Sequence, residues 1–326
     1  MEIAPVVLIA FNRPKETKEV IKKIREARVP KLYIVMDAPR ENNEKDKKLN
    51  NEVLNIINDI DWNCEVKKNI APKNMGVGRR PYTGIDWVFE HEEMAIILED
   101  DCVPSLSFFD YCTDLLHRYK DDSRIMHISG TRYNTEFDMG NNDSYFFSRY
   151  QNNWGWATWR RAWKYYNFDL DNYESVLKKN YLNLRFSKYE AYHWKSYFDS
   201  AKVYKAHMWD YQWQFAIFMN AGLCIFPKVN LISNIGPFGT TRPNFVDYIY
   251  FSEVDDNFEI EEHPEVIFTN DEFDKYYFHK HLSEKKPILQ RIIRKIKRTI
   301  ILRTIFQKID RKKFDQKKDN YYAKIK

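Results

Sequence analysis

Three adjacent carboxylates follow a short apolar run in the stretch AIILEDDCVP. Residues 95–98 are apolar, and Glu99, Asp100 and Asp101 come directly after them. Carboxylates this close raise one another's pKa values unless a cation or hydrogen-bond donors offset their charge. The chemistry of this segment therefore depends on what neutralises the three side chains.

Two answers fit the spacing. Asp100 and Asp101 could cap the helix predicted to begin near residues 105–108, although residues 102–104 separate them from it. A hard divalent cation, Mg²⁺ or Mn²⁺, is the other answer. Proteins hold Mg²⁺ with one or two carboxylates, while phosphate oxygens and water complete the shell. A nucleoside diphosphate would supply those oxygens, so the cation is the favoured interpretation.

Polar side chains also follow two earlier apolar runs. The run 5–11 ends at Phe11 and is followed by Asn12 and Arg13, and the run 31–37 ends in Asp37. In open α/β sheets, ligands bind at the carboxyl ends of the strands. We therefore expect these residues to meet Glu99–Asp101 at one edge and to form a nucleotide site.

A glycine-containing basic loop is predicted at residues 71–82. Gly76, Gly78, Arg79 and Arg80 could approach a phosphate, and a solvated basic turn explains the same residues equally well. The chain has no Gly-x-Gly-x-x-Gly after its first strand and no Gly-x-x-x-x-Gly-Lys. Dinucleotide-binding and ATPase-type phosphate-binding motifs are therefore absent.

The first hundred residues alternate between predicted strands and helices. The predicted strands are 5–11, 31–37, 64–70 and 94–100, and the predicted helices between them are 15–27, 50–60 and 82–90. This order predicts an α/β fold with a Rossmann-like open sheet flanked by helices. We expect a domain at 1–283, with a nucleotide-binding half (1–101) and an acceptor and catalytic half (102–283), and a separate tail at 284–326.

Composition narrows the class of protein. No run of 18 apolar residues predicts a membrane-spanning helix. The N-terminal stretch has the character of a buried strand and lacks the features of a signal peptide. The four cysteines form no Cys-x-x-Cys pair, so a zinc site is disfavoured and free thiols in a reducing cytosol are expected.

LEDDCVPSLSFFDYC resembles the metal-binding segment of the GT-A fold N-acetylglucosaminyltransferase I family. PVVLIAFNRP, LYIVMDAPRE, WDYQWQF (209–215) and CIFPKVNLISNIGPFGT (224–240) resemble further segments of that family in the same order. NNWGWATWRRAW (152–163) also resembles bacterial polysaccharide glycosyltransferases. The similarity covers roughly residues 5–240 and implies a GT-A fold, a UDP-sugar donor and Mn²⁺ or Mg²⁺ as cofactor.

The resemblance also implies roles for single residues at the donor. Asp101 would bind the metal, Glu99 and Asp100 would hold the donor's sugar and ribose, and Asp37 would contact the base. The remaining donor-site residues would be Phe11, Asn12, Arg13 near the diphosphate, Arg79 and Arg80. Arg80-Pro81 stands where the family would have a histidine at the base, which leaves the identity of the base open.

The resemblance further implies that Asp210 is the catalytic base of an inverting transfer. It would remove the proton of the acceptor hydroxyl, while the departing diphosphate is offset by the cation and Arg13. Capping of the helix that follows Asp210 is an alternative that does not exclude catalysis. Tyr211-Gln212 replaces the second aspartate of the family's Trp-Asp-Asp-Trp segment.

Aromatic residues are expected on the acceptor side. Trp154, Gly155, Trp156 and Trp209 are assigned there, and core packing is at least as plausible for one of the pair Trp154 and Trp156. A glycan or lipid-linked glycan in bacterial surface polysaccharide synthesis is the expected acceptor.

The tail is strongly basic. Residues 285–326 contain 16 Lys and Arg against 3 Asp, and because the whole chain carries +5, residues 1–284 carry −8. Leu289, Ile292, Ile293 and Ile296 lie near helical spacing, which is typical of a basic amphipathic helix on an anionic membrane. Docking on the domain or on a partner is the alternative. We expect a cytoplasmic enzyme at the inner face of the plasma membrane, and no nucleic-acid partner.

Two other functions remain open. A sugar nucleotidyltransferase would share the nucleotide-binding sheet but should carry a Gly-rich basic signature after the first strand. A carbohydrate- or membrane-binding module without turnover would tolerate Asp210→Asn, whereas a transferase would not.

Overall fold

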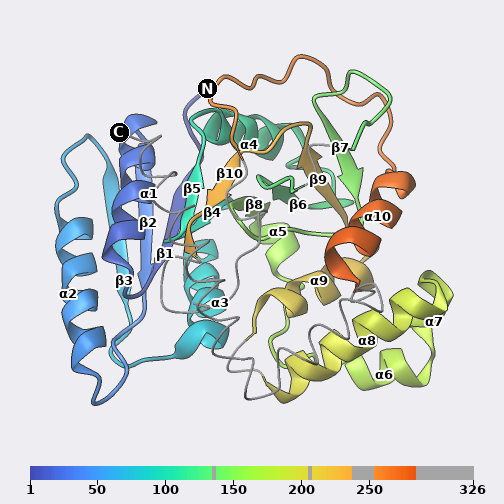
Figure 1. The fold of residues 1–326 in the computed structure, drawn as a ribbon, viewed down its shortest axis with the longest axis horizontal. Helices are drawn as coiled ribbons and strands as arrows, with labels where there is room; N and C mark the ends of the chain where they lie inside the picture. Colours follow the sequence, from blue (N-terminus) through green and yellow to red (C-terminus); the bar gives the residue numbers. More distant parts are fainter. Residues whose placement is uncertain (134–136, 205–207, 237–252, 284–326) are drawn as a thin grey trace, which may run out of the picture.

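The computed structural model describes residues 1–133, 137–204, 208–236 and 253–283. An eight-stranded mixed sheet forms the centre of this part, in the order β3-β2-β1-β4-β8-β6-β9-β7 (Figure 1). Its strands are β1 (Val6–Ala10), β2 (Lys31–Met36), β3 (Glu65–Ile70), β4 (Met94–Glu99), β6 (Ile125–Ser129), β7 (Tyr145–Ser148), β8 (Trp156–Trp159) and β9 (Leu223–Pro227). The predicted tail helix at 284–326 lies outside the described residues.

The sheet joins a parallel part to a mixed part. β1 pairs in parallel with both β2 and β4, and β2 pairs in parallel with β3. β8 runs antiparallel to β4 and β6, β9 runs parallel to β6, and β7 runs antiparallel to β9. A short ribbon of β5 (Cys102–Pro104) and β10 (Ile232–Asn234) lies beside this sheet. The Rossmann-like α/β prediction is therefore confirmed.

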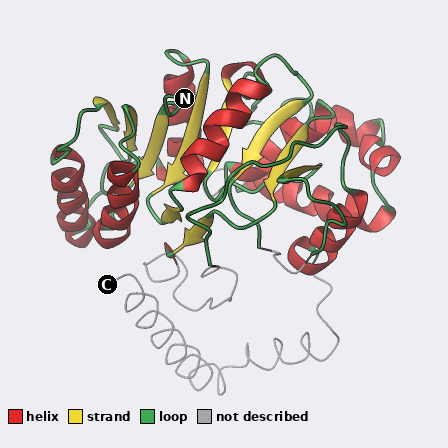
Figure 2. Ribbon diagram, turned by 90° about the horizontal axis from the view of Figure 1, so that it is seen from above, coloured by secondary structure: helices red, strands yellow, loops and turns green. Residues whose placement is uncertain are grey.

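Helices cover both faces of the sheet (Figure 2). They are α1 (Pro14–Glu26), α2 (Glu44–Asn58), α3 (Gly76–Phe89), α4 (Ser107–Arg118), α5 (Arg160–Trp163), α6 (Tyr173–Lys178), α7 (Tyr181–Arg185), α8 (Lys188–Val203), α9 (Asp210–Met219), α10 (Asp271–Tyr277) and the π-helix η4 (Phe278–Leu282). Successive residues of a strand point to opposite faces. Val6 and Leu8 accordingly pack with α1, α2 and α4, whereas Val7 and Ile9 pack with α3, α8 and α9.

The third helix begins earlier than its sequence predicts. We expected a loop at 71–82 and a helix at 82–90, but α3 starts at Gly76 and contains Pro81. The carboxylate of Asp37 accepts hydrogen bonds from the backbone N–H groups of Met75 (2.9 Å) and Gly76 (2.8 Å). The Asp37 carboxylate, which follows β2, thus provides acceptors for the first N–H groups of the helix. For this reason α3 can begin in a segment that has no apolar periodicity.

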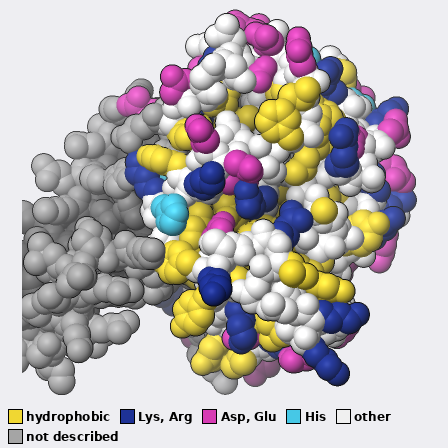
Figure 3. Space-filling model, turned by 90° about the vertical axis from the view of Figure 1, so that its right-hand side faces the viewer, with side chains coloured by type: hydrophobic (Ala, Val, Ile, Leu, Met, Phe, Trp, Pro, Cys, Tyr) yellow, Lys and Arg dark blue, Asp and Glu magenta, His cyan; other side chains and the backbone are white. Residues whose placement is uncertain are grey.

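Exposed apolar side chains lie on the side formed by α7, α8 and α10. Leu184, Tyr192 and Val203 are each more than 70% exposed. Figure 3 shows this side, where hydrophobic side chains lie between positively and negatively charged ones. Within the described residues, no helix combines the length and the apolar character needed to cross a bilayer.

Candidate functional site

The carboxyl ends of β1, β2 and β4 bring the predicted donor residues to one edge of the sheet. The backbone N–H of Phe11 donates to Asp100 Oδ2 at 3.1 Å, which joins the ends of β1 and β4. The Asn50 side chain donates to the carbonyl oxygens of Phe11 and Asp37, at 2.9 Å each, and so joins β1 to β2. The structure thus assembles residues separated by almost ninety positions in the chain.

The guanidinium of Arg13 lies against the carboxylates. It forms an ion pair with Asp101, and its Nη1 lies 3.4 Å from Asp100 Oδ1. The side chains of Asp100 and Asp101 are less than a tenth exposed, so a counter-charge at this position is needed. Within the described chain, Arg13 supplies the positive charge that the sequence led us to seek.

Burial raises the pKa values of two of the carboxylates, Glu99 and Asp100. The pKa of Glu99 rises to about 7, chiefly because burial disfavours its charged form. Arg13 opposes this rise, whereas Asp100 and Asp210 add to it. Burial also raises the pKa of Asp100, against the opposing effects of Arg13 and the Phe11 N–H. Glu99 is therefore close to half-protonated at neutral pH.

The ribbon of β5 and β10 closes the site on the other side of Asp101. The backbone N–H of Ile235 donates to the carbonyl oxygen of Asp101 at 2.8 Å. Gly236 lies directly against the carboxylate, because an added Cβ would come within 2.0 Å of Asp101 Oδ2. The segment 224–240, which resembled the family's glycine-ending loop, thus reaches Asp101 at residue 236. Residues 237–240 lie outside the described part.

Three of the predicted donor residues are engaged with the protein itself. Asp37 accepts the N–H groups at the start of α3, and Asn12 donates to Asp46 Oδ1 on α2 at 2.8 Å. Arg80 is 4% exposed and donates to the Met36 carbonyl at 3.1 Å, and burial lowers its pKa. These contacts fix α2 and α3 against the strand ends.

Arg79 has a different position. It is exposed, and its guanidinium lies 5.3 Å from the centre of the Phe168 ring. A surface hollow beside Arg13 is lined by Asn12, Lys15, Lys18 and Lys45 among others. Basic residues of α1 and α2 therefore lie around the hollow beside Arg13, whereas Arg79 of α3 lies against Phe168.

Asp210 reaches the same site from the far half of the sequence. It is the first residue of α9, and its negative charge contributes to the raised pKa values of Glu99 and Tyr166. Tyr166 donates its hydroxyl to the carbonyl oxygen of Trp209 at 3.0 Å, which fixes the start of the helix. A carboxylate at the beginning of a helix is stabilised by the helix dipole. The structure therefore places Asp210 near enough to Glu99 for the two charges to interact.

The assignment of two tryptophans to the acceptor side needs correction. Trp156 has no exposed surface, and Trp209 is 4% exposed. Trp156 lies within about 6 Å of the ring centres of Trp163, Trp209 and Trp213. Large aromatic rings stabilise a fold most when they are buried together. Trp156 and Trp209 are therefore core residues.

Trp154 and Gly155 occupy a tight turn before β8. Trp154 is partly buried and meets Tyr133 edge-on, with ring centres 5.0 Å apart. Gly155 has a φ of +59°, and an added Cβ would lie 2.3 Å from Ile232. Only glycine fits at position 155, and Trp154 beside it is partly buried rather than part of the core interior.

The sequence did not single out the residues that hold α9. His127 on β6 is fully buried, and the indole N–H of Trp213 donates to its Nδ1 at 3.1 Å. Its Nε2 lies 3.0 Å from the Asn152 carbonyl oxygen, which only accepts, so Nε2 carries the proton. Burial lowers the pKa of His127 to about 3. A lone polar residue in an apolar strand was the only sequence signal.

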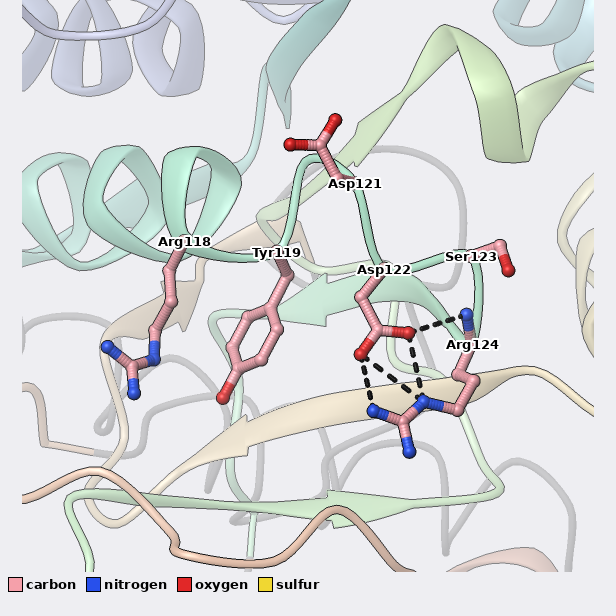
Figure 4. Close-up of a pocket in the computed structure, with 6 residues that line it drawn as sticks. All are labelled: Arg118, Tyr119, Asp121, Asp122, Ser123 and Arg124. Atoms are coloured by element: carbon pink, nitrogen blue, oxygen red, sulfur yellow. Dashed lines mark hydrogen bonds and ion pairs between the residues drawn. The ribbon is translucent and has the colours of Figure 1, made fainter.

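Another hollow lies at the opposite edge of the sheet. Figure 4 shows it in the turn between α4 and β6, where Asp122 and Arg124 form an ion pair at 2.7 Å. This turn precedes the amino end of β6, whereas the candidate site lies at the carboxyl ends of the strands. Within the described residues, no group of three or more His, Cys, Asp or Glu side chains could hold a metal ion by itself.

Sequence comparisons leave the chain without a family, since no protein-family model and no curated protein matches it. Among solved structures, a mannosyltransferase from Pyrobaculum calidifontis in complex with GDP-Man and Mn²⁺ is 11% identical at a TM-score of 0.33, over 48% of this chain and 45% of that one. A UDP-glucose pyrophosphorylase complexed with UDP-glucose is 12% identical at a TM-score of 0.26, over 45% of this chain and 63% of that one.

A 4-diphosphocytidyl-2C-methyl-D-erythritol synthase from Anaerococcus prevotii is 8% identical at a TM-score of 0.31, over 61% and 85% of the two chains. The matched region therefore covers less than two thirds of the mannosyltransferase and of the UDP-glucose pyrophosphorylase. Identities and TM-scores this low assign no activity to the chain. Its function has to be argued from the site.

Proposed function

We propose that the chain is a nucleotide-sugar-dependent enzyme and, within that class, a metal-dependent inverting glycosyltransferase of the GT-A fold. One observation carries the proposal. Buried carboxylates with a cationic partner lie at the strand ends, and Asp210 from the far half of the chain is close enough to influence Glu99. Open α/β sheets bind ligands at this edge, and perturbed carboxylates cluster at functional sites.

The residues present fit a divalent cation. Asp100 and Asp101 offer carboxylate oxygens, and a cationic group, the Arg13 guanidinium, already lies against both. Asp101 would hold Mn²⁺ or Mg²⁺ together with the oxygens of a donor diphosphate, for which one or two protein carboxylates suffice. When bound, the ion would offset the charge that develops on the departing diphosphate.

The chain's own residues would divide the remaining work. Asp210 would accept the proton of the acceptor hydroxyl. Arg13 would stabilise the negative charge that develops on the departing diphosphate. Glu99, half-protonated near neutral pH, can donate a hydrogen bond to a sugar hydroxyl as well as accept one. Trp154 is the aromatic side chain left for the acceptor after Trp156 and Trp209 are assigned to the core.

The proposal also covers the donor base, the acceptor and the cellular location of the enzyme. A UDP-linked hexose or N-acetylhexosamine and a lipid-linked glycan of a bacterial surface polysaccharide follow from the resemblance. Their support is that sequence similarity together with the charge of residues 285–326, which suits an anionic membrane at the cytoplasmic face.

Calorimetric titration of UDP, GDP and CMP into the full chain, with Mn²⁺ and then with EDTA, tests the proposal. We expect UDP to bind with Mn²⁺, and the affinity to fall by about 100-fold in EDTA or in Asp101→Ala. Asp61→Asn is the matched control, since Asp61 pairs only with exposed Arg25 at 2.6 Å. Binding of no nucleotide under either condition would overturn the enzyme assignment.

A further inference from the structure

A second surface feature lies away from the candidate site, where the N-terminus meets α4. This groove is bounded by the start of the chain, the end of α1, the exposed side of α4 and the segment 256–260. In Figure 1 that segment passes close to the N-terminus and to α4. Exposed Leu106 and partly buried Ile3, Phe258 and Ile260 give the groove apolar surface.

The rim of the groove is acidic. Glu26, Asp110, Asp114, Asp256 and Glu259 all line it. Glu26 and Asp256 lie within 3.6 Å of Lys23 Nζ, whereas the ion pairs among the described residues do not include the other three carboxylates. Asp110 and Asp114 lie one helical turn apart on α4, a spacing at which like charges destabilise a helix. A cationic ligand between them would remove that repulsion.

Tyr111 supplies an independent observation in the wall of the groove. It is 2% exposed, and its hydroxyl has no hydrogen-bond partner in the described part of the chain. Its ring meets Phe258 edge-on, with ring centres 5.9 Å apart. Tyr111 and Phe258 thus give this part of the groove an aromatic wall.

We propose that this acidic groove binds part of the chain's own basic C-terminal segment, residues 285–326. The chemistry is complementary, because 16 Lys and Arg face 3 Asp in that segment, while the groove offers five carboxylates. Leu289, Ile292 and Ile293 lie between the first cationic residues and match the apolar surface. A segment of 42 residues can span up to about 140 Å when extended, so the groove is within reach.

Docking in the groove would also limit how residues 285–326 can bind an anionic membrane. The same cationic side chains cannot face the groove and an anionic lipid surface at once, so the two would compete for the segment. Binding in the groove would thus hold the segment away from lipid until a membrane with sufficient negative charge displaces it. This inference does not depend on the transferase activity.

Limited trypsin digestion of the full chain tests it, because the segment is rich in cleavage sites. The variant is Asp110→Asn/Asp114→Asn/Glu259→Gln, and the control Glu41→Gln/Glu90→Gln/Glu272→Gln changes the charge equally at exposed positions elsewhere. We expect cleavage after residue 284 to be roughly fivefold faster in the groove variant and unchanged in the control. Salt at about 1 M should remove the difference, because it screens the pairing.

Carbodiimide cross-linking provides a direct second measurement. It should join groove carboxylates to lysines of residues 285–326 within a single chain, and vesicles rich in phosphatidylserine should reduce the yield. Equal cleavage rates in wild type and groove variant, with no such cross-links, would overturn the proposal. Cross-links found only between two copies, at a yield that rises with protein concentration, would also overturn it.

Discussion

The two halves of the candidate site hold their carboxylates in opposite ways. At the ends of β1, β2 and β4, Asp100 and Asp101 form ion pairs with Arg13, and Asp100 also accepts a hydrogen bond from the Phe11 N–H. At the start of α9, Asp210 is held by a helix whose inner face packs among tryptophans. Asp100 and Asp101 are thus held by direct contacts with a charged or donating group, whereas the packing of α9 sets the position of Asp210. In the proposed transferase, the first arrangement would suit a half that holds a diphosphate, and the second would suit a half that places one proton acceptor.

The largest effect should come from the catalytic half. Asp210→Asn keeps the size and the helix-starting position of the side chain but removes its ability to take a proton. We expect kcat to fall by about 10²–10⁴-fold, with nucleotide affinity within about twofold of wild type. Release of UDP from UDP-sugars, alongside calorimetry, measures both quantities.

Asp171→Asn is the control, because Asp171 is exposed and its hydrogen bonds within the described residues go to the nearby Asn167. Unchanged turnover in Asp210→Asn would remove the contrast between the halves, since Asp210 would then act only as an acidic residue in the first turn of α9.

Removal of Arg13 should have the next largest effect. Arg13→Met leaves Asp100 and Asp101 buried without their counter-charge, which should lower the free energy of unfolding by about 3 kcal/mol. Because a divalent cation can take over the same neutralisation, Mn²⁺ should raise the melting temperature of this variant by more than that of wild type. Thermal unfolding with and without Mn²⁺ measures the difference.

Arg25→Met is the matched control, since Arg25 pairs with Asp61 on the surface. It should leave the melting temperature almost unchanged and should not respond to Mn²⁺, because solvent screens an exposed pair. If Mn²⁺ stabilises both variants equally, the strand ends hold no cation site.

A change in the packing around α9 should have a smaller effect, divided between stability and turnover. His127→Leu leaves the indole N–H of Trp213 buried without its acceptor, so the free energy of unfolding should fall by about 2 kcal/mol. Turnover should fall less than in Asp210→Asn, because the carboxylate remains. Urea unfolding and kcat at a temperature where both proteins are folded test this. His117→Leu, on the exposed side of α4, should change neither quantity.

The strand ends and their meeting at one edge of the sheet were readable from the sequence, whereas the individual contacts between their side chains were not. The apolar runs that end at Phe11, Asp37 and Glu99 are local signals, and the parallel strand arrangement follows from them. The pairing of Arg13 with Asp101 joins positions 88 residues apart, which no local pattern encodes. The early start of α3 likewise depends on Asp37 in another strand. Core and surface tryptophans look alike in sequence, so the burial of Trp156 emerges only from packing.

The smallest predicted effect concerns the pH dependence of stability in the donor half. The folded pKa of Glu99 is about 7, above its ordinary value of 4.5, so the folded state binds more protons than the unfolded state between these pH values. Its contribution to stability is therefore present at low pH and lost as the pH rises through this window. One group gives a slope of at most about 1.4 kcal/mol per pH unit.

Glu99→Gln should flatten this decline between pH 5 and 7.5 without abolishing it, since burial raises the pKa of Asp100 in the same direction. Glu65→Gln is the control. Lys67 lowers the pKa of Glu65, so its contribution changes only below its ordinary value of 4.5. The free energy of unfolding in urea, measured across the window, distinguishes the two variants. Identical slopes in wild type and Glu99→Gln would mean that Glu99 stays ionised, and the donor half would then hold all of its carboxylates by charge alone.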